Sequence, residues 1–304
     1  MDIVGKRNWF FLGSLLIIIP GIIFLIIFGL NLSIDFTGGS RLTFSLPKAA
    51  STEEVNKIKN AFEEEKIKVA TIEKSNNLVF VRTQPIDQAQ DAKVVNKIKS
   101  ELKNFKQEEF ETIGPTIGAE TTSNAVKAVI IASILIVLYI TFSFRQVPKP
   151  ASSFRFGICA IIALVHDVLV VMGAFALFGH FFGVEIDSLF VTAILTVIGF
   201  SVHDTIVVFD RIRENLKRMG GTSFPQVVND SILQTIDRSL NTSLTVVLVL
   251  LAMFLFGGES IKWFVVALLI GIVSGTYSSI FNAAAILVVW QNWSVKRKAL
   301  KKIN

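Results

Sequence analysis

Six long apolar stretches dominate the pattern of hydrophobic and polar positions along the chain. They cover residues 9–30, 125–144, 156–178, 188–209, 239–256 and 263–290. A helix of about 20 apolar residues is needed to cross a bilayer. The pattern therefore predicts a polytopic α-helical membrane protein with six transmembrane helices. The first stretch has no charged residue and no convincing cleavage site, so we expect a retained anchor rather than a signal peptide.

One polar segment, residues 31–121, separates the first two stretches and is long enough to fold by itself. Its periodicity predicts strands at 40–46, 68–75, 78–83 and 109–113, and helices at 51–65 and 87–104. Ser51 and Glu54 have the spacing of a capping box, and Asn76-Asn77 suits a tight hairpin turn. The order β-α-β-β-α-β predicts an inserted α+β ferredoxin-like domain. Since no His, carboxylate and Ser set marks an active site, we expect a binding or mechanical module and no enzyme.

Composition and charge define the class of protein and its orientation. A hydrophobic content of 52% and a mean hydropathy of +0.59 exclude an ordinary soluble domain. Lys and Arg cluster before the first span, between spans two and three, between four and five, and after six. The two short loops on the other side, 180–187 and 257–262, contain only Lys262 among Lys and Arg residues. The positive-inside rule thus predicts cytoplasmic termini and an extracytoplasmic domain. The net charge of +6 reflects this topology, so we expect no nucleic-acid partner.

The sequence offers little for metal, redox or nucleotide chemistry. Cys159 is the single cysteine, and three scattered histidines do not suggest a zinc site. No P-loop motif is present, so we expect no nucleotide or other cofactor. An ion gradient is then the natural source of energy for any work that the chain does.

An acidic residue within the fourth span is the strongest functional signal. Asp204 lies near the cytoplasmic end of that span, follows His203 and shares a helix face with Ser201. A carboxylate at membrane depth costs a few kcal/mol, so such a group usually faces a partner or a water-filled path. Arg238, at the start of the fifth span, is the expected partner of Asp204. The alternatives are a purely structural Asp204 and an Arg238 that snorkels to the headgroups.

Other polar features belong to the third span, the last span and the loop between spans four and five. His166 and Asp167 lie midway along the third span, where they either pair structurally with a neighbouring helix or assist a proton relay. The last span is rich in Gly, Ser and Ala, which favours tight packing, with a sliding contact as the alternative. Residues 211–237 have the Pro225 start signal and apolar spacing of an amphipathic helix lying along the cytoplasmic interface.

Two glycine clusters bracket the polar segment. They contain Asp35, Gly38 and Gly39 on one side, and Gly114, Pro115 and Gly118 on the other. Glycine adopts backbone angles closed to other residues, while proline stiffens its neighbourhood. The clusters are either simple turns at a junction between membrane and domain, or a paired hinge that lets the domain swing.

Five motifs extend over nearly the whole chain. They are DFTGG at 35–39, ALVHDV at 163–168, the stretch 199–215, RSLNTSLT at 238–245 and GTYSSIFNAA at 275–284. Together they resemble the SecF family, the membrane subunits of the bacterial SecD–SecF protein-export complex. In this resemblance Asp204 matches the intramembrane acidic residue of the family and Arg238 its basic partner. His203 stands where the family pattern has Asn, which changes the titration expected beside Asp204.

The resemblance implies a fold, partners and an activity. The fold is one half of a resistance-nodulation-division (RND) bundle, completed by a SecD-like membrane subunit. The activity is the use of the proton-motive force in late steps of preprotein translocation by SecYEG across the bacterial plasma (inner) membrane. The expected organisation is a first helix in 1–30, the extracytoplasmic domain in 31–121, five helices in 122–293 with the loop 211–237, and a basic tail in 294–304. The alternatives are an RND-type exporter of lipid or small molecules and a structural scaffold of the translocon.

Overall fold

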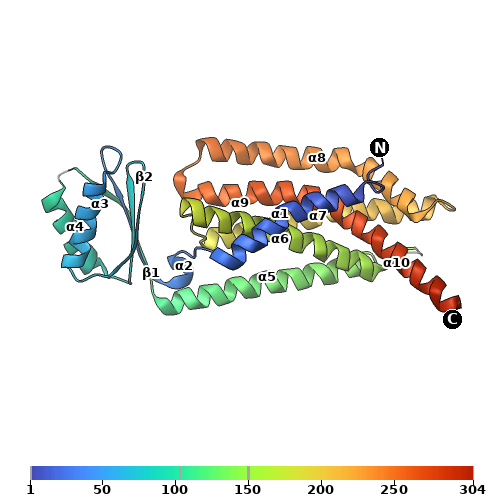
Figure 1. Cartoon of the computed structure of the whole chain (residues 1–304), viewed down its shortest axis with the longest axis horizontal. Coiled ribbons are helices and arrows are strands. Elements are labelled where there is room, and N and C mark those ends of the chain that lie inside the picture. The colour runs from blue at the N-terminus through green and yellow to red at the C-terminus, as the bar shows by residue number, and fades with distance from the viewer. Residues whose placement is uncertain (1, 103, 149–150, 304) are drawn as a thin grey trace. The chain divides into compact units, whose positions relative to one another are not determined.

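The computed structural model describes residues 2–102, 104–148 and 151–303, and the chain divides into two compact units. The membrane unit comprises Met1–Leu30, Lys127–Val184 and Leu189–Asn304. The insert unit comprises Asn31–Val126 together with Glu185–Ser188 (Figure 1). The insert unit is therefore larger than the segment 31–121, because it recruits a short piece of chain from between two membrane helices.

Two polar contacts attach this short piece to the insert unit. Arg82 donates to Glu185 over 2.7 Å, and the backbone and hydroxyl of Ser188 donate to Asp35 over 2.8 and 2.6 Å. Burial raises the pKa of the Glu185 carboxyl, while the charge of Arg82 opposes that shift. No periodic pattern predicts this attachment, since it depends on contacts between residues far apart in the chain.

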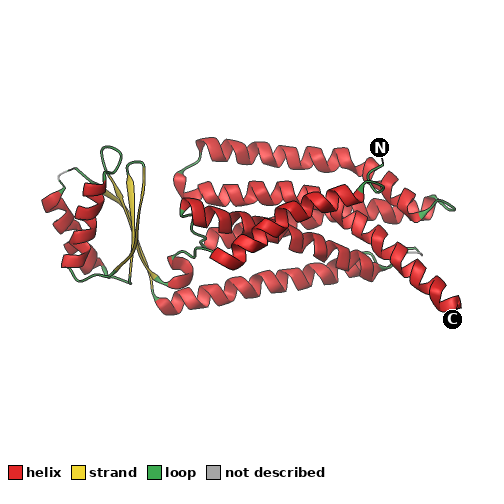
Figure 2. Ribbon diagram, in the orientation of Figure 1, coloured by secondary structure: helices red, strands yellow, loops and turns green. Residues whose placement is uncertain are grey.

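The insert unit has the ferredoxin-like fold. Its elements are β1 (Gly39–Ser45), α3 (Thr52–Glu64), β2 (Val69–Ser75), β3 (Leu78–Thr83), α4 (Gln88–Glu101) and β4 (Lys106–Ile113). The sheet order is β2-β3-β1-β4 with antiparallel pairing throughout, and both helices cover one face of the sheet (Figure 2). The core lies between the helices and the sheet, where Phe44 and Val81 meet Ile58, Phe62 and Val94. The predicted order of elements is confirmed, although β4 begins three residues earlier than expected.

Local signals explain the turns and helix starts of this unit. The Ser51 hydroxyl accepts from the Glu54 backbone at 3.2 Å, and the Glu54 carboxylate accepts from the Ser51 backbone at 2.9 Å, which confirms the capping box. These bonds to Ser51 lower the pKa of the Glu54 carboxyl. Asn76 has a φ of 53°, as the predicted tight turn between β2 and β3 requires.

The two glycine clusters pack directly on one another. A short helix, α2 (Ile34–Thr37), ends at Gly38, whose φ is 71°. A Cβ atom on Gly38 would lie 2.8 Å from the Pro115 Cα, and one on Gly118 would lie 2.8 Å from the Gly38 nitrogen. Larger side chains are thus excluded by backbone on both sides. The close joint explains the need for glycine at Gly38 and Gly118, whereas Gly114 has open space beside it. Swinging about this joint stays a prediction.

Among the described residues, six helices are long and apolar enough to span a membrane, as predicted. They are formed by α1 (Arg7–Phe28), α5 (Pro115–Ser143), α6 (Ser153–Phe182), α7 (Ser188–Arg218), α8 (Phe224–Phe256), and α9 (Glu259–Tyr277) with its continuation. That continuation is a π-helical turn, η1 (Ser278–Ala283), followed by α10 (Ala284–Ile303). α5 begins at Pro115, inside the predicted junction, since proline is well suited to the first turn of a helix.

The helix predicted within residues 211–237 does begin at its Pro225 start signal, but it is not a separate helix with a free apolar face. α7 continues to Arg218, and α8 runs without a break from Phe224 through the fifth span. The apolar residues Val227, Val228 and Ile232 are buried inside the protein instead of facing lipid headgroups. Asn215 of α7 donates to Ser231 of α8 over 2.9 Å. An amphipathic pattern does not reveal whether its apolar face will meet lipid or another helix, and here it meets α7.

Glycines allow two pairs of membrane helices to approach closely. A Cβ atom on Gly173 of α6 would lie 2.6 Å from the Cα of Gly21 in α1. Gly271 and Gly275 of α9 lie against α7, and a Cβ atom on Gly275 would lie 3.0 Å from the Cβ of Ser201. The prediction of tight packing along the last span is therefore confirmed.

Candidate functional site

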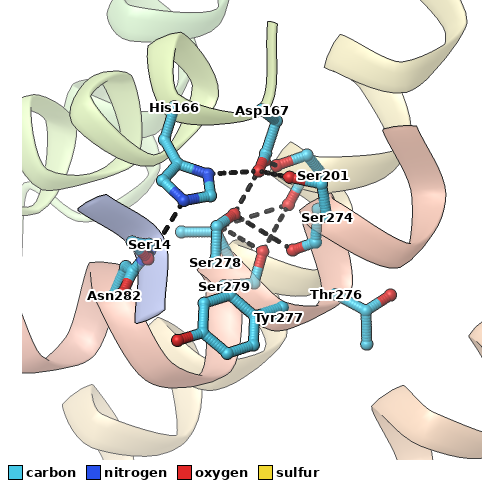
Figure 3. A network of polar contacts seen from close by, with 12 residues as sticks. Ser14, His166, Asp167, Ser201, Ser274, Thr276, Tyr277, Ser278, Ser279 and Asn282 are labelled. Atoms are coloured by element: carbon cyan, nitrogen blue, oxygen red, sulfur yellow. Dashed lines mark hydrogen bonds and ion pairs between the residues drawn. The ribbon is translucent and has the colours of Figure 1, made fainter. Parts of the chain in front are cut away.

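A buried carboxylate, Asp167, is the centre of a polar network inside the membrane unit (Figure 3). Its Oδ1 accepts from His166 Nδ1 at 2.9 Å and from the Ser274 hydroxyl at 2.8 Å. Its Oδ2 accepts from the hydroxyls of Ser201 at 2.6 Å and Ser278 at 2.7 Å. Only 1% of Asp167 is exposed. Because both oxygens accept two donors each, the arrangement fits an ionised carboxylate that joins α6, α7 and the last span.

The π-helical turn η1 brings the donors of the last span to this carboxylate. Ser274, Ser278 and Asn282 recur at every fourth residue. In a regular α-helix each fourth residue advances past the previous one by about 40°. The wider turn of η1 offsets that advance, and π turns occur frequently at functional sites. In the same turn Ser279 donates to the Ser201 carbonyl over 3.0 Å and contacts the Thr205 hydroxyl at 2.8 Å.

His166 extends the network to the first helix. Its Nε2 lies 3.1 Å from the hydroxyl of Ser14 in α1. The Asn282 amide donates to the same hydroxyl over 2.8 Å. Nearby, the Tyr277 hydroxyl donates to the Phe10 carbonyl over 2.7 Å. The network therefore joins four of the six spans through side-chain hydrogen bonds.

Asp204 is equally buried but has much weaker partners. Only 1% of Asp204 is exposed. The Ser243 hydroxyl lies 3.4 Å from its Oδ2, which is long for a hydrogen bond between two oxygens, and Ser243 also contacts Thr276 at 2.6 Å. His203 Nδ1 lies 3.7 Å from its Oδ1, and the His203 side chain is 59% exposed. Asp204 thus has one exposed titratable neighbour and no strong donor among the hydrogen bonds of the described residues.

The expected ion pair between Asp204 and Arg238 is absent from the part of the chain that the structure describes. The buried face of α8 at this level contains Ser239 and Ser243, four residues apart. Arg238 precedes Ser239 and so points about 100° away from that face. Its side chain is exposed and lines a cavity of about 390 Å³ beside Glu214. Arg238 therefore faces this cavity rather than Asp204.

The contacts of the other predicted site residues agree with the expectations only in part. His166 and Asp167 pair with polar groups on neighbouring helices, as one of the two expectations required, and Ser201 bonds Asp167 rather than Asp204. His203 does approach Asp204. Their participation in a relay stays a prediction.

Three serines and one asparagine that complete the network were not predicted as site residues. These residues are Ser14, Ser274, Ser278 and Asn282. From amino-acid composition alone, the serines of the last span are small residues suited to close helix packing. A usable signal existed in their recurrence at every fourth position with Asn282, which marks a polar stripe on a membrane helix. Within the described residues, no group of three or more His, Cys, Asp and Glu is arranged to hold a metal ion.

Comparisons with known proteins identify the family. The model of the protein-export membrane protein SecD/SecF C-terminal family matches residues 93–293, and that of the SecD/SecF GG motif matches residues 23–46. The chain is 51% identical to the protein translocase subunit SecF of Thermobaculum terrenum, covering 96% of this chain and 94% of the relative. It is 35% identical to the SecDF subunit of Bacillus subtilis, covering 97% of this chain and 39% of that longer protein.

A solved structure gives the same result. The crystal structure of SecDF from Thermus thermophilus, described as a translocon-associated membrane protein, superposes with a TM-score of 0.83 at 34% identity. The superposition covers 96% of this chain and 39% of the SecDF chain. The six-span bundle with an inserted four-stranded domain thus corresponds to one portion of a longer two-part protein.

Proposed function

Because the chain belongs to the SecD/SecF family of protein-export membrane proteins and has a role in Sec protein export, we propose that it couples proton flow to late steps of preprotein translocation. It is a multi-pass membrane protein, and relatives in which SecD and SecF form one chain support a SecD-like partner. The proposal adds SecYEG and the translocating preprotein as partners. It also adds the bacterial plasma membrane, with cytoplasmic termini and an extracytoplasmic insert unit. The chain is a transport component, and the proposal contains no covalent step.

The observation that carries this proposal is the contrast between the two buried carboxylates. Asp167 accepts four hydrogen bonds of 2.6–2.9 Å, whereas the one hydroxyl bonded to Asp204 is 3.4 Å away. Removing the charge from Asp167 would sacrifice several charge-assisted bonds, each worth about 1.5–3 kcal/mol. Removing it from Asp204 would sacrifice little. Asp204 is therefore the carboxylate suited to take up and release a proton during a cycle.

Proton uptake at Asp204 supplies a two-state element. In the ionised state Asp204 attracts the hydroxyl of Ser243 in α8 and the ring of His203. In the protonated state these attractions weaken, and α7 can adopt a second packing against α8. His203, exposed beside Asp204, gives a route for protons to the carboxylate.

The exposed side chain of Arg238 indicates a role in contact with a partner protein. An Arg that faces hydrocarbon is costly, so such residues usually meet a protein partner or water. We propose that the SecD-like partner covers this face of α8 and that Arg238 senses the charge state of the assembled site from there. This retains Arg238 in the relay without a direct pair to Asp204.

The test measures preprotein translocation in vesicles that contain this chain, its SecD-like partner and SecYEG, with and without a proton gradient. Asp204→Asn preserves shape and mimics the protonated state, so it should abolish the increment that the gradient produces while leaving gradient-independent translocation intact. Arg238→Met should lose the same increment. Asp230→Asn is the matched control, because Asp230 lies on α8 and bonds only Gln226 among the contacts of its described side chain.

Two results would separate the alternatives. Full gradient stimulation in Asp204→Asn would show that Asp204 is structural, as a translocon scaffold requires. Gradient-driven release of lipid or a small molecule from the vesicles, with no effect on the preprotein, would support the exporter. Repeating the assay with a sodium gradient identifies the coupling ion.

A further inference from the structure

The hydrogen-bond partners of His166 assign the tautomer of its ring. Asp167 Oδ1 lies 2.9 Å from His166 Nδ1 and also accepts from Ser274. An ionised carboxylate only accepts, so the proton of the neutral imidazole lies on Nδ1. His166 Nε2 is then an acceptor, and the Ser14 hydroxyl at 3.1 Å must donate to it.

The direction of the remaining bonds follows from this assignment. The Asn282 amide donates to Ser14, Ser14 donates to His166, and His166 donates to Asp167. In this row of hydrogen bonds, every donated hydrogen points toward the Asp167 carboxylate. One atom is left over: Asn282 Oδ1 is buried and has no hydrogen-bond partner among the described residues, in a residue that is only 3% exposed. A buried amide oxygen without a partner normally destabilises the folded state.

This spare acceptor is what a second proton would require. If a proton binds His166 Nε2, that nitrogen becomes a donor and the Ser14 hydroxyl must accept from it. The hydrogen of Ser14 then needs a new acceptor, and Asn282 Oδ1 reaches Ser14 when the amide turns over. In the observed orientation the Asn282 oxygen lacks a partner among the described residues, and after the amide turns over the Asn282 nitrogen would lack one. The neutral and charged states of His166 therefore contain the same number of hydrogen bonds within the protein.

We propose that His166 is a second proton-binding site, and that Ser14 and Asn282 reverse the direction of their hydrogen bonds when the proton binds. When His166 is neutral, Asn282 donates to Ser14 and Ser14 donates to His166. When His166 is charged, His166 donates to Ser14 and Ser14 donates to Asn282. Asp167 supplies the negative charge that balances the imidazolium in a buried position. The proton is added at Nε2, and no other group gains or loses one.

The surroundings of His166 favour a switch of this kind. From α6 itself the facing titratable group is Asp167, and from the last span it is Tyr277, whose hydroxyl is occupied by the Phe10 carbonyl. α1 contributes the neutral Ser14, and α7 contributes the neutral Ser201 through its bond to Asp167. The charge of the site therefore depends on the pair of His166 and Asp167. Histidine is the side chain whose ordinary charge change falls between about pH 5 and about pH 8.

The reversal occurs at the contact between α1 and η1. Both Ser14 and Asn282 change their bonding partners while His166 stays attached to Asp167. Protonation of one side chain in α6 would thus be felt by the first helix and by the π-helical turn. A biological use of this site in export depends on the proton coupling proposed above, but protonation of His166 is measured without export.

The test uses this chain labelled with nitrogen-15 in its histidines and assembled with unlabelled partner in lipid vesicles. The chain has three histidines, so His180→Gln and His203→Gln assign the spectrum. The imidazole nitrogen shifts report the tautomer and charge directly. We expect His166 to be the Nδ1–H tautomer at about pH 8 and an imidazolium at about pH 5.

Two substitutions test the role of the hydroxyl and the amide. Ser14→Ala and Asn282→Leu each remove a group that the charged state needs, so the ratio of charged to neutral His166 at about pH 6 should fall about tenfold. Ser14→Thr keeps the hydroxyl and should titrate like the wild type, which covers the possibility that Ser14→Ala fails to assemble. Ser133→Ala is the matched control, because the Ser133 hydroxyl donates to the Val129 carbonyl within α5.

A His166 that stays neutral throughout this range would overturn the proposal, as would the Nε2–H tautomer at high pH. Titration of Ser14→Ala and Asn282→Leu at the wild-type position would do the same. These outcomes are independent of the translocation assay. A neutral His166 together with a gradient-insensitive Asp204→Asn would reject the second site and retain the proposed function. Protonation of His166 together with full gradient stimulation in Asp204→Asn would retain the second site and reject the proposed function.

Discussion

Gly173→Ala tests whether the contact between α1 and α6 maintains the buried network. The added Cβ would lie 2.6 Å from the Gly21 Cα, whereas ordinary contact begins at 3.4 Å. The obstacle is backbone, so α1 must move away by the difference, about 0.8 Å. Ser14 lies two turns from Gly21 on the same helix, and its bond to His166 is 3.1 Å long. The same displacement at Ser14 would break that bond.

The free-energy change can be bounded term by term. Overpacking costs about 1–3 kcal/mol, and the lost hydrogen bond costs about 1 kcal/mol. Replacing Gly by Ala in a helix returns about 1 kcal/mol. The net destabilisation is therefore about 1–3 kcal/mol. Gly199→Ala in α7 is the matched control, since no atom lies within 4 Å of its added Cβ, and it should stabilise the chain by up to about 1 kcal/mol.

Thermal unfolding in detergent, followed by tryptophan fluorescence, separates the two variants. The gap of about 2–4 kcal/mol corresponds to a Tm for Gly173→Ala at least about 4 °C below that of Gly199→Ala. The histidine spectrum should also show a shift at His166 Nε2, which loses the hydrogen bond from Ser14, while the Nδ1–H signature that depends on Asp167 stays. Equal Tm values in the two variants would refute the rigid contact between Gly21 and Gly173, because α1 would then have adapted without cost.

The other predictions concern the insert unit and the topology. Ser51→Ala should destabilise α3 by about 1 kcal/mol at neutral pH, measured by hydrogen exchange. Because the pKa of Glu54 is lowered in the folded state, its contribution is present above the unfolded pKa and lost as the pH falls through the folded pKa, so the gap between variant and wild type should narrow in acid. Asp35→Ala removes the acceptor of two hydrogen bonds from the start of α7 and should speed exchange at residues 185–188. With Cys159 buried, a cysteine at Ser75 should react with an impermeant reagent from outside the cell and one at Thr222 should not; the reverse would overturn the orientation.

The sequence sufficed where local chemistry decides the outcome. The spans follow from apolar length, and the insert fold follows from alternation, a capping box and a two-asparagine turn. It failed where the partner of an apolar face decides, as in residues 211–237. It also failed for Arg238, since an Asp and an Arg at similar depth are compatible with many helix rotations. The buried face of α8 contains Ser239 and Ser243, and this fact comes only from packing.

The network around Asp167 shows a different limit. Hydroxyl side chains on membrane helices serve equally as small packing residues and as donors, and composition does not distinguish these roles. The π turn that aligns Ser274, Ser278 and Asn282 has no clear signature in the sequence. The polar stripe on the last span indicates that its side chains face a buried acceptor. Only the fold shows that this acceptor lies on α6.

The sheet order of the insert unit has a consequence for how an unfolded polypeptide can meet it. β2 and β4 are the outer strands, and both pair with their neighbours through a register irregularity. β4 contains Lys106, Glu108, Glu109 and Glu111, and β2 contains Glu73 and Lys74. Charges and bulges on outer strands oppose the addition of another strand. If the proposed preprotein meets this unit, we expect it to pass without adding a strand to the sheet, so that its release breaks no strand pairing.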